Sequence, residues 1–333
     1  MSIISVKNLK KYYSVYQKEP GFLGSIKSIL QRNHTEVRAV DGISFEINEG
    51  ELVGFIGPNG AGKTTTLKVL SGLLYPTSGQ AHVLDYEPFK RKPEFQKQFS
   101  LVMGQKNQLW WDLPPWESFI LNKEIYEVSD EQFNTVLNEL ADMLEVADIL
   151  KVQVRKLSLG QRMKCELIAA LLHSPKVLFL DEPTIGLDVL AQKKMRDFLK
   201  GYNKKFNATI ILTSHYMGDV KELCKRVIII DQGKILYDGL LEKLQEKFAP
   251  HKVIEVDFDI SESSFVNEKE LSNIGQVKEF DGIHALIHVP GKEAAKRASK
   301  LLDLFPVKDL TIEEPPIEDI IREVFNKSEK FKV

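Results

Sequence analysis

Residues 57–64 read Gly57-Pro58-Asn59-Gly60-Ala61-Gly62-Lys63-Thr64, and a second threonine, Thr65, follows. This segment fits the pattern G-x-x-x-x-G-K-[ST], and it lies between a predicted strand and a predicted helix, as that pattern requires. Glycines permit backbone conformations with positive φ and bring backbone N–H groups close to phosphate oxygens. In this pattern the lysine reaches the β- and γ-phosphates and the first threonine ligates Mg²⁺. The sequence therefore predicts that residues 59–65 bind a nucleoside triphosphate.

A second apolar run ends in two carboxylates. Residues 177–180 read Val-Leu-Phe-Leu, and Asp181 and Glu182 follow. Open α/β sheets bind their ligands at the carboxyl ends of their strands. We expect Asp181 to hold Mg²⁺ through water and Glu182 to polarise an attacking water as a general base. Taken alone, such a pair is often a solvated strand end, but a phosphate-binding loop in the same chain favours the catalytic interpretation.

Short apolar runs alternate along the chain with longer segments of helical spacing. The runs occupy residues 51–56, 177–180, 209–213 and 227–230. Continuous apolar strands separated by helices predict a mostly parallel sheet that is covered on both faces. Residues from about 108 to 160 differ, because they show helical patterns at 119–126 and 130–150 and no convincing strand. We expect an α/β domain over residues 1–245 that carries a helical subdomain.

The last part of the chain predicts a second domain. A helix over 240–248 leads to Pro250, and residues 250–333 then alternate again between strand and helix patterns. We expect strands at 253–258, 284–289 and 307–312 and helices at 292–304 and 317–325. This is enough for a small separate α+β domain.

The net charge, the cysteine count and the lack of long apolar runs exclude several classes of protein. The 333 residues include 45 Lys+Arg and 47 Asp+Glu, so the net charge is −2 and gives no basic footprint for nucleic acid. The two cysteines, Cys165 and Cys224, have neither the number nor the spacing for a disulfide framework or a cysteine-rich zinc site. No secretory signal and no long apolar run occurs. We expect a soluble chain in a reducing compartment.

Further motifs give the chain a resemblance to a known family. Residues 157–161, Leu-Ser-Leu-Gly-Gln, resemble the LSGGQ signature of the nucleotide-binding subunits of ATP-binding-cassette (ABC) transporters, with leucine in place of the first glycine. Four further positions match the family in order, and the resemblance covers about residues 2–240. They are Tyr13 at the adenine-stacking aromatic (with Tyr12 as an alternative), Gln105 at the Q-loop, Asp188 in the D-loop and His215 at the switch histidine.

The resemblance implies roles for these residues. Members of the family form head-to-tail dimers with two ATP molecules at the interface, in which Ser158, Gly160 and Gln161 of one subunit would cap the γ-phosphate held by the other. Gln105 would be a metal ligand and a catalytic residue, His215 would orient the γ-phosphate, and Asp188 would contact nucleotide. The implied cofactors are ATP and Mg²⁺. The implied partners are a second ATP-binding subunit, identical or paralogous, and integral-membrane permeases, which would hold the chain at the cytoplasmic face of the cell membrane.

Three weaker features bear on the type of transporter, which we expect to be of the exporter branch. An insertion at 14–36 carries a basic amphipathic helical pattern that would lie on a membrane, on a permease or on its own domain. All three tryptophans, Trp110, Trp111 and Trp116, follow the Q-loop, where the family receives the permease; internal packing is an equal alternative. The C-terminal domain resembles the accessory domain of exporter-type subunits.

Two other functions compete with this interpretation. A soluble ABC ATPase acting on ribosomes or DNA is disfavoured, because the chain has one phosphate loop, leaves no room for a long coiled coil between Lys63 and Asp181, and has a near-zero net charge. A regulatory cassette that holds ATP without hydrolysing it is disfavoured by the presence of Glu182 and His215.

Overall fold

The computed structural model describes residues 2–16, 34–104, 106–248, 250–259 and 266–330. They divide into two units, Met1–Gly239 and Leu240–Val333. This boundary lies six residues before the predicted end of the first domain, 245. The reason is helix α9 (Leu241–Phe248), which buries Leu244 completely and packs against α12 (Ile317–Lys330), so that both helices belong to the second unit.

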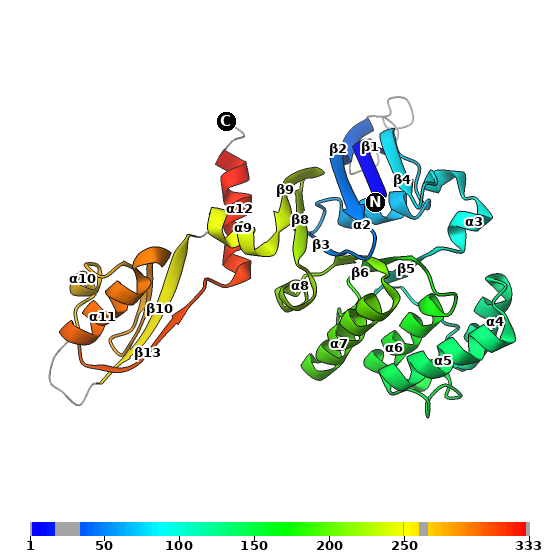
Figure 1. The fold of residues 1–333 in the computed structure, drawn as a ribbon. Helices are drawn as coiled ribbons and strands as arrows, with labels where there is room; N and C mark the ends of the chain where they lie inside the picture. The colour runs from blue at the N-terminus through cyan, green and yellow to red at the C-terminus, as the bar shows by residue number, and fades with distance from the viewer. Residues whose placement is uncertain (1, 17–33, 105, 249, 260–265, 331–333) are drawn as a thin grey trace, which may run out of the picture. The chain divides into compact units, whose positions relative to one another are not determined.

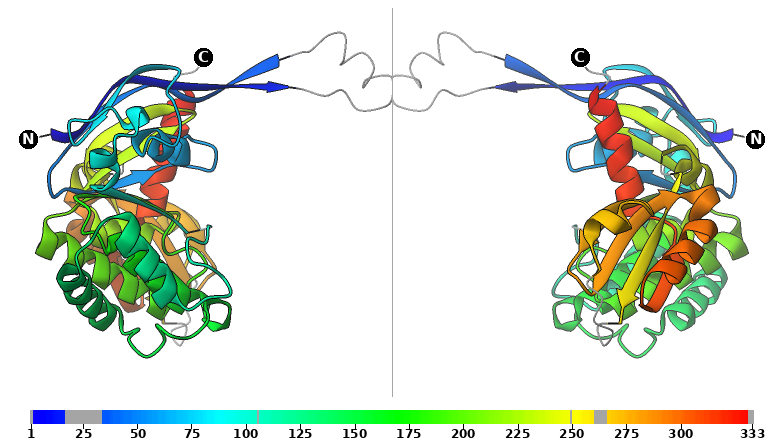
Figure 2. Two further views of the ribbon diagram at one scale, coloured as in Figure 1. Left: turned by 90° about the vertical axis from the view of Figure 1, so that its right-hand side faces the viewer. Right: turned by 90° about the vertical axis from the view of Figure 1, so that its left-hand side faces the viewer.

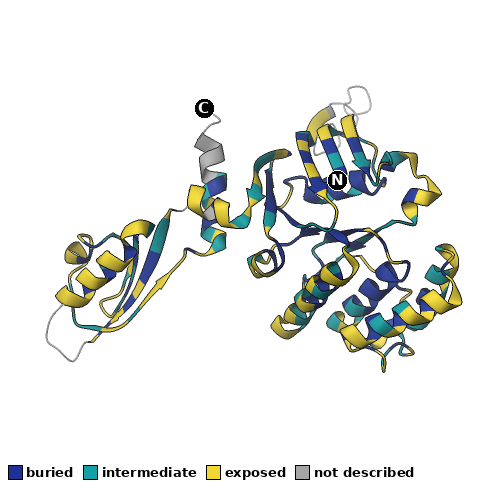
Figure 3. Cartoon of the chain, in the orientation of Figure 1, coloured by how far each residue is buried: buried dark blue, intermediate teal, exposed yellow. Residues whose placement is uncertain are grey.

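A six-stranded sheet forms the centre of the first unit, in the order β5-β6-β7-β3-β8-β9 (Figure 1). The pairs β5–β6, β6–β7, β7–β3 and β3–β8 are parallel, as the continuous apolar runs predict. Colouring by burial shows these central strands as almost wholly buried (Figure 3). The strands are β3 (Leu52–Ile56), β5 (Phe99–Met103), β6 (Val177–Asp181), β7 (Thr209–Thr213), β8 (Arg226–Asp231) and β9 (Lys234–Leu240).

A second, antiparallel sheet of three strands, in the order β2-β1-β4, shares a hydrophobic core with the first. Its strands are β1 (Ser2–Tyr16), β2 (His34–Asn48) and β4 (Ser78–Val83). Helix α2 (Lys63–Leu70) lies between the two sheets in Figure 1 and contributes Leu67 and Leu70 to that core. The sheet places β2 against the start of α2, where the phosphate loop ends.

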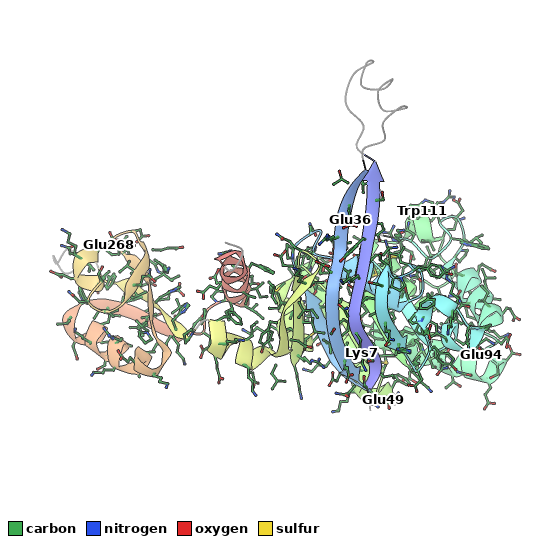
Figure 4. All side chains as sticks on the ribbon, turned by 90° about the horizontal axis from the view of Figure 1, so that it is seen from above. Lys7, Glu36, Glu49, Glu94, Trp111 and Glu268 are labelled. Atoms are coloured by element: carbon green, nitrogen blue, oxygen red, sulfur yellow. The ribbon has the colours of Figure 1, made fainter. Side chains whose placement is uncertain are left out.

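The predicted insertion at 14–36 is shorter than expected. Strands β1 and β2 pair outward as far as Tyr16 and His34, so Ser14 and Glu36 are strand residues that face each other across the ladder. β4 pairs with β1 only as far as Lys10, and the rest of β1 and β2 forms a two-stranded ribbon beyond it (Figures 2 and 4). The amphipathic pattern within 17–33 falls outside the described residues.

Helices α6 (Leu159–Leu171), α7 (Val189–Phe206) and α8 (Met217–Leu223) lie on the other side of the six-stranded sheet. Residues 108–160 hold α4 (Pro115–Ile125), α5 (Asp130–Leu144) and a short 3-10 helix, Val154–Lys156. Ser129 caps α5 by accepting a hydrogen bond from the Gln132 N–H. The predicted helix 130–150 ends early, because Glu145 is left-handed (φ 54°) and the Val146 N–H turns back to the Ala141 carbonyl.

The second unit is a four-stranded antiparallel sheet in the order β11-β12-β10-β13, with a core shared with α11. This matches the predicted α+β class, with differences in four elements. The predicted helix 292–304 begins at Ala294 after a 3-10 turn, α12 extends beyond 325, and neither strand β11 nor the short helix α10 is predicted from the sequence. The elements are β10 (His251–Phe258), α10 (Glu268–Leu271), β11 (Gln276–Phe280), β12 (His284–Pro290), α11 (Ala294–Leu304) and β13 (Val307–Glu313).

In the described part of the chain, no helix is long and apolar enough to cross a membrane.

Candidate active site

The loop that follows β3 is held by close backbone contacts that only glycine permits. A Cβ atom at Gly57 would lie 2.1 Å from the Ile230 carbonyl oxygen, and one at Gly62 would lie 2.2 Å from the Ala39 carbonyl oxygen. Gly62 also has a φ of 107° and is the residue that precedes α2. The loop is therefore clamped between β8 and β2, and it delivers the N-terminus of α2 to the carboxyl edge of the sheet. The first backbone N–H groups of a helix bind anions in this setting.

Lys63, the first residue of α2, turns back over the loop. Its Nζ donates hydrogen bonds to the carbonyl oxygens of Gly57 at 2.6 Å and Pro58 at 3.0 Å, and the side chain is buried. Burial lowers the pKa of Lys63, although the nearby carboxylates of Glu182 and Asp181 oppose that shift. The ammonium group is thus held where a phosphate would replace the carbonyl oxygens as its partner.

Asp181, at the end of β6, is the hydrogen-bonding centre of the site. Thr64 donates its hydroxyl to Asp181 Oδ2 at 2.7 Å, and Thr213 donates its hydroxyl to Asp181 Oδ1 at 2.6 Å. The carboxyl ends of β6 and β7 and the first turn of α2 therefore meet at one carboxylate. Thr213 was not among the predicted site residues. Its position at the end of a buried strand, two residues before His215, is the signal that could have identified it.

Glu182 and His215 come together next to this centre. His215 Nε2 lies 2.6 Å from Glu182 Oε1, and the Glu182 side chain is mostly buried. The Glu182 backbone is left-handed (φ 55°), and its N–H is held by the Thr213 hydroxyl at 3.1 Å. A left-handed glutamate costs of order 1 kcal/mol or more, so the surrounding contacts must hold it in place.

The end of β5 also reaches this site. Its last residue, Met103, pairs with Asp181, and a Cβ at the next residue, Gly104, would lie 2.1 Å from the Glu182 carbonyl oxygen. The following residue, Gln105, lies outside the described residues, so its predicted role as a metal ligand and catalytic residue stays a prediction. Beyond it, the buried carboxylate of Glu166 on α6 accepts hydrogen bonds from the N–H groups of Gln108 and Leu109 at 3.0 and 3.3 Å. A glutamate inside an apolar helix pattern is the sequence signal for this missed anchor.

The predicted signature residues lie at the start of α6. Ser158 and Gln161 form a capping box, in which the Ser158 hydroxyl accepts from the Gln161 N–H and the Gln161 side chain accepts from the Ser158 N–H. The two residues between them, Leu159 and Gly160, lie beside the D-loop and the first turn of α7. A Cβ at Gly186 would lie 2.9 Å from Leu159 Cδ2, and one at Gly160 would lie 3.5 Å from the Ala191 Cβ. Asp188 caps α7 by accepting from the Ala191 N–H at 2.8 Å.

Tyr12 and Tyr13 occupy different surroundings on β1. The Tyr12 hydroxyl donates a 2.5 Å hydrogen bond to Asp41, which raises the pKa of Tyr12, and the Arg38 guanidinium lies 5.3 Å from the Tyr12 ring centre. Tyr13 is half-buried, and the Lys11 Nζ lies 5.1 Å from its ring centre. Successive strand residues point to opposite faces, so only one of the two rings can face a base. Tyr13 as the adenine-stacking aromatic stays a prediction.

The donor set at Asp181 suits one metal in particular. In the described part of the chain, no group of three or more His, Cys, Asp or Glu side chains is placed to hold a metal ion. Mg²⁺ typically takes one or two carboxylates, and water and substrate phosphates complete its octahedron. The Thr64 hydroxyl and the Asp181 carboxylate, which contact each other, fit that requirement for an ion that arrives with a nucleotide.

Comparisons with known proteins place the chain in a family. Residues 40–185 match the family model "ABC transporter", and residues 250–313 match the model "EvrA-like ABC transporter, C-terminal domain". The chain is 32% identical over 210 residues to the ABC transporter ATP-binding protein NatA of Bacillus subtilis, covering 63% of this chain and 85% of that protein. It is 31% identical over 226 residues to the Nod factor export ATP-binding protein I of Burkholderia orbicola, covering 68% of this chain and 71% of that protein.

A solved ATP-binding subunit of an ABC transporter has the same fold. It superposes with a TM-score of 0.61 at 24% identity over 74% of this chain and 93% of that chain. The predicted cassette fold is therefore confirmed, together with the extra C-terminal domain. The phosphate loop, the carboxylates that follow β6 and the extent of these matches agree: the chain belongs to the ABC transporter ATP-binding proteins, the ATPase subunits of ABC transporters.

Proposed function

We propose that this chain binds ATP with Mg²⁺, dimerises on ATP, hydrolyses it and thereby drives export through separate permease subunits. The observation that carries the proposal is the convergence of Lys63, Thr64, Asp181, Glu182 and His215 at the carboxyl edge of one sheet. Together they supply four requirements of phosphoryl transfer: phosphate binding, metal binding, a base and a group that orients the γ-phosphate.

In the binding step, the backbone N–H groups of residues 59–65 and the Lys63 ammonium hold the phosphates, and Tyr13 stacks on adenine. Lys63 exchanges its hydrogen bonds to the uncharged Gly57 and Pro58 carbonyls for bonds to phosphate, in which both the donor and the acceptor carry charge. Thr64 would ligate Mg²⁺ and Asp181 would hold it through water, and the bound ion would neutralise charge on the phosphates. Gln105 is proposed as a further metal ligand and catalytic residue.

In the hydrolytic step, Glu182 accepts a proton from the attacking water. His215, 2.6 Å from that carboxylate, orients Glu182 and the γ-phosphate. The restrained left-handed backbone at Glu182 suits this role, because a general base must be held within hydrogen-bond reach of one proton.

The test of this assignment is phosphate release by the purified Glu182→Gln variant. The substitution keeps the shape of the side chain and removes the base, so we expect turnover to fall at least 100-fold while ATP binding persists. Glu145→Gln is the matched control, because Glu145 is also left-handed (φ 54°) but lies at the end of α5. Phosphate release from Glu182→Gln at the rate of the control would refute the role of Glu182 as base.

Dimerisation is proposed from the surface beside the signature. Ser158, Gly160, Gln161 and Asp188 are predicted to complete the ATP site of a second subunit. The exposed apolar side chains next to them, Leu159, Val189 and Leu190, belong to the start of α6 and α7, and Val189 is 80% exposed. Adjacent exposed aliphatic residues are typical of a surface that a partner covers.

Permease docking is proposed at the loop that follows the Q-loop. Trp110 is 55% exposed and Trp111, labelled in Figure 4, is 48% exposed, whereas Trp116 packs edge-on against Phe133. Glu166 holds this loop against α6, so the two exposed rings project from an ordered support. The docked permease would keep the chain at the cytoplasmic face of the membrane. The direction of transport, export, is proposed from the relative that is named for Nod factor export.

A further inference from the structure

Asp219, in the first turn of α8, is a buried charge outside the residues assigned so far. Its side chain is fully buried, and it has three polar partners. Oδ2 accepts hydrogen bonds from the hydroxyls of Thr184 at 2.6 Å and Ser214 at 2.8 Å. Oδ1 accepts from Nη1 of Arg196 on α7 at 3.0 Å. A buried carboxylate needs such partners, because an unpaired one would cost several kcal/mol in lost hydration, of the order given for ions in protein interiors.

The two hydroxyl partners lie on the chain segments that carry Glu182 and His215. Thr184 is two residues after Glu182, and Ser214 immediately precedes His215. A single oxygen atom, Asp219 Oδ2, therefore joins the segment leaving β6 to the segment leaving β7, just beyond the point where Glu182 and His215 meet at 2.6 Å.

Both segments need such support. Glu182 has a strained left-handed backbone, and His215 is exposed, so burial of its own side chain does not fix the His215 conformation. Thr184 and Ser214, by contrast, are almost completely buried, and they transmit the position of Asp219 to their neighbours.

We infer that Asp219 is a positioning residue for ATP hydrolysis, holding Glu182 and His215 within hydrogen-bond distance of each other. The inference rests on the roles proposed above for those two residues. Because its side chain is fully buried, Asp219 acts through Thr184 and Ser214.

Because all three partners of Asp219 are donors, replacing the carboxylate by an amide, in Asp219→Asn, tests the inference. An asparagine at 219 has only one acceptor oxygen. If that oxygen faces Thr184 and Ser214, the amide N–H₂ faces the Arg196 guanidinium, which is also a donor; if it faces Arg196, both hydroxyls lose their acceptor. Asp219→Asn therefore cannot keep all three bonds. Thr184→Val removes one of them and keeps the shape of the side chain.

The matched control is Glu222→Gln. Glu222 is the other carboxylate that binds Arg196, at 2.8 Å from Nε, but no hydrogen bond links it to Thr184 or Ser214. It therefore tests the loss of a carboxylate partner of Arg196 without the loss of the connection to the catalytic pair.

The experiment is steady-state phosphate release by the purified full chain, with the melting temperature and the imidazole ¹⁵N NMR signals measured on the same samples. We expect Asp219→Asn and Thr184→Val each to lower kcat at least 10-fold, with KM for ATP within about threefold of wild type, and to move the His215 signals. We expect Glu222→Gln to leave kcat and the His215 signals unchanged. In the double variant Asp219→Asn/Thr184→Val, the added Thr184→Val substitution should lower kcat by a smaller factor than it does in the wild type, because Asp219 and Thr184 act as a unit.

The inference is overturned if folded Asp219→Asn or Thr184→Val keeps kcat within twofold of wild type, or if Glu222→Gln lowers kcat equally. Where Asp219→Asn does not fold, Thr184→Val decides alone. Glu182→Gln separates the two claims: if it is inactive while the Asp219 variants are fully active, only this inference fails, and if it retains activity, the proposed roles themselves fail.

Discussion

His215 Nε2 lies 2.6 Å from Glu182 Oε1, although 32 residues lie between them in the sequence. The contact exists because β6 and β7 are parallel neighbours whose last residues, Asp181 and Thr213, pair with each other. The residues that follow two such strands emerge at the same edge of the sheet.

We expect His215→Ala to lower kcat about 10²-fold, within the range given for lost acid–base or orienting groups, with less than a threefold change in ATP affinity. The imidazole contacts the proposed base Glu182, whereas Lys63 and the phosphate loop are proposed to hold the phosphates, so binding should survive its loss. Phosphate release and calorimetric titration with a non-hydrolysable ATP analogue measure the two effects. A loss of affinity as large as the loss of turnover would show that His215 acts mainly in binding.

Asp181→Asn tests the metal site. The variant keeps an acceptor for the Thr64 or Thr213 hydroxyl but lacks the negative charge that Mg²⁺ requires. We expect the Mg²⁺ concentration for half-maximal phosphate release to rise at least 10-fold, and chelation of Mg²⁺ to stop release by the wild type. An unchanged magnesium dependence in Asp181→Asn would contradict the assignment.

His173 predicts how stability depends on pH. It stacks on Tyr126 at 3.8 Å between ring centres and Nε2 lies 3.2 Å from the Phe99 carbonyl oxygen, while burial lowers its pKa from 6.5 to about 4. The fold therefore holds the neutral ring, and the unfolded chain takes up the proton first. The contribution of the neutral ring to the free energy of unfolding is complete above pH 6.5 and is lost as the pH falls from 6.5 towards 4. By linkage, the loss at pH 5 is about 2 kcal/mol.

The measurement is the free energy of unfolding of wild type and His173→Gln between pH 7 and pH 5. Gln can still donate to the Phe99 oxygen but does not titrate, so the variant should lose about 2 kcal/mol less than wild type over this range. Equal losses in the two proteins would show that His173 is not the titrating group.

Of the three tryptophans, we expect Trp110 and Trp111 to serve permease docking and Trp116 to serve the stability of the fold. Trp110→Ala and Trp111→Ala remove exposed rings, so we expect the free energy of unfolding to change by less than about 0.5 kcal/mol. Trp116→Ala removes the contact with Phe133 and should cost about 2 kcal/mol or more. In a mild-detergent purification of the tagged chain, the double variant Trp110→Ala/Trp111→Ala should recover much less permease than wild type. Equal recovery would place the docking surface elsewhere.

The strands that carry the site could be predicted because they are short, apolar and bounded by turn residues. β7 was predicted to the residue, and β3, β6 and β8 to within one. The antiparallel strands β1 and β4 could not be found in the same way, since half of each faces solvent and their polar residues hide the apolar alternation. The early end of α5 depends on the left-handed Glu145, which no residue type in the sequence signals.

The predicted site residues could be identified by their motifs, whereas the residues that hold them in position could not. Lys63, Asp181 and His215 stand in recognisable patterns, but Thr213, Asp219 and Glu166 matter because of what folding brings next to them. A buried carboxylate on a helix looks in sequence like one polar position among many. The most distant partner lies 58 positions away for Glu166 and 35 for Asp219, and only the fold brings these residues together.

We propose that the second subunit is a copy of this chain and that ATP joins the two before hydrolysis, and the mass of the Glu182→Gln variant in solution measures this assembly. The chain has a mass of 38.0 kDa, so the account predicts a species of 2 × 38.0 = 76.0 kDa by sedimentation or light scattering with saturating ATP and Mg²⁺, and 38.0 kDa without nucleotide. Ser158→Arg in the same variant should prevent the shift, because a bulky side chain would occupy the cap at the start of α6. A mass that stays at 38.0 kDa with ATP bound would contradict the account.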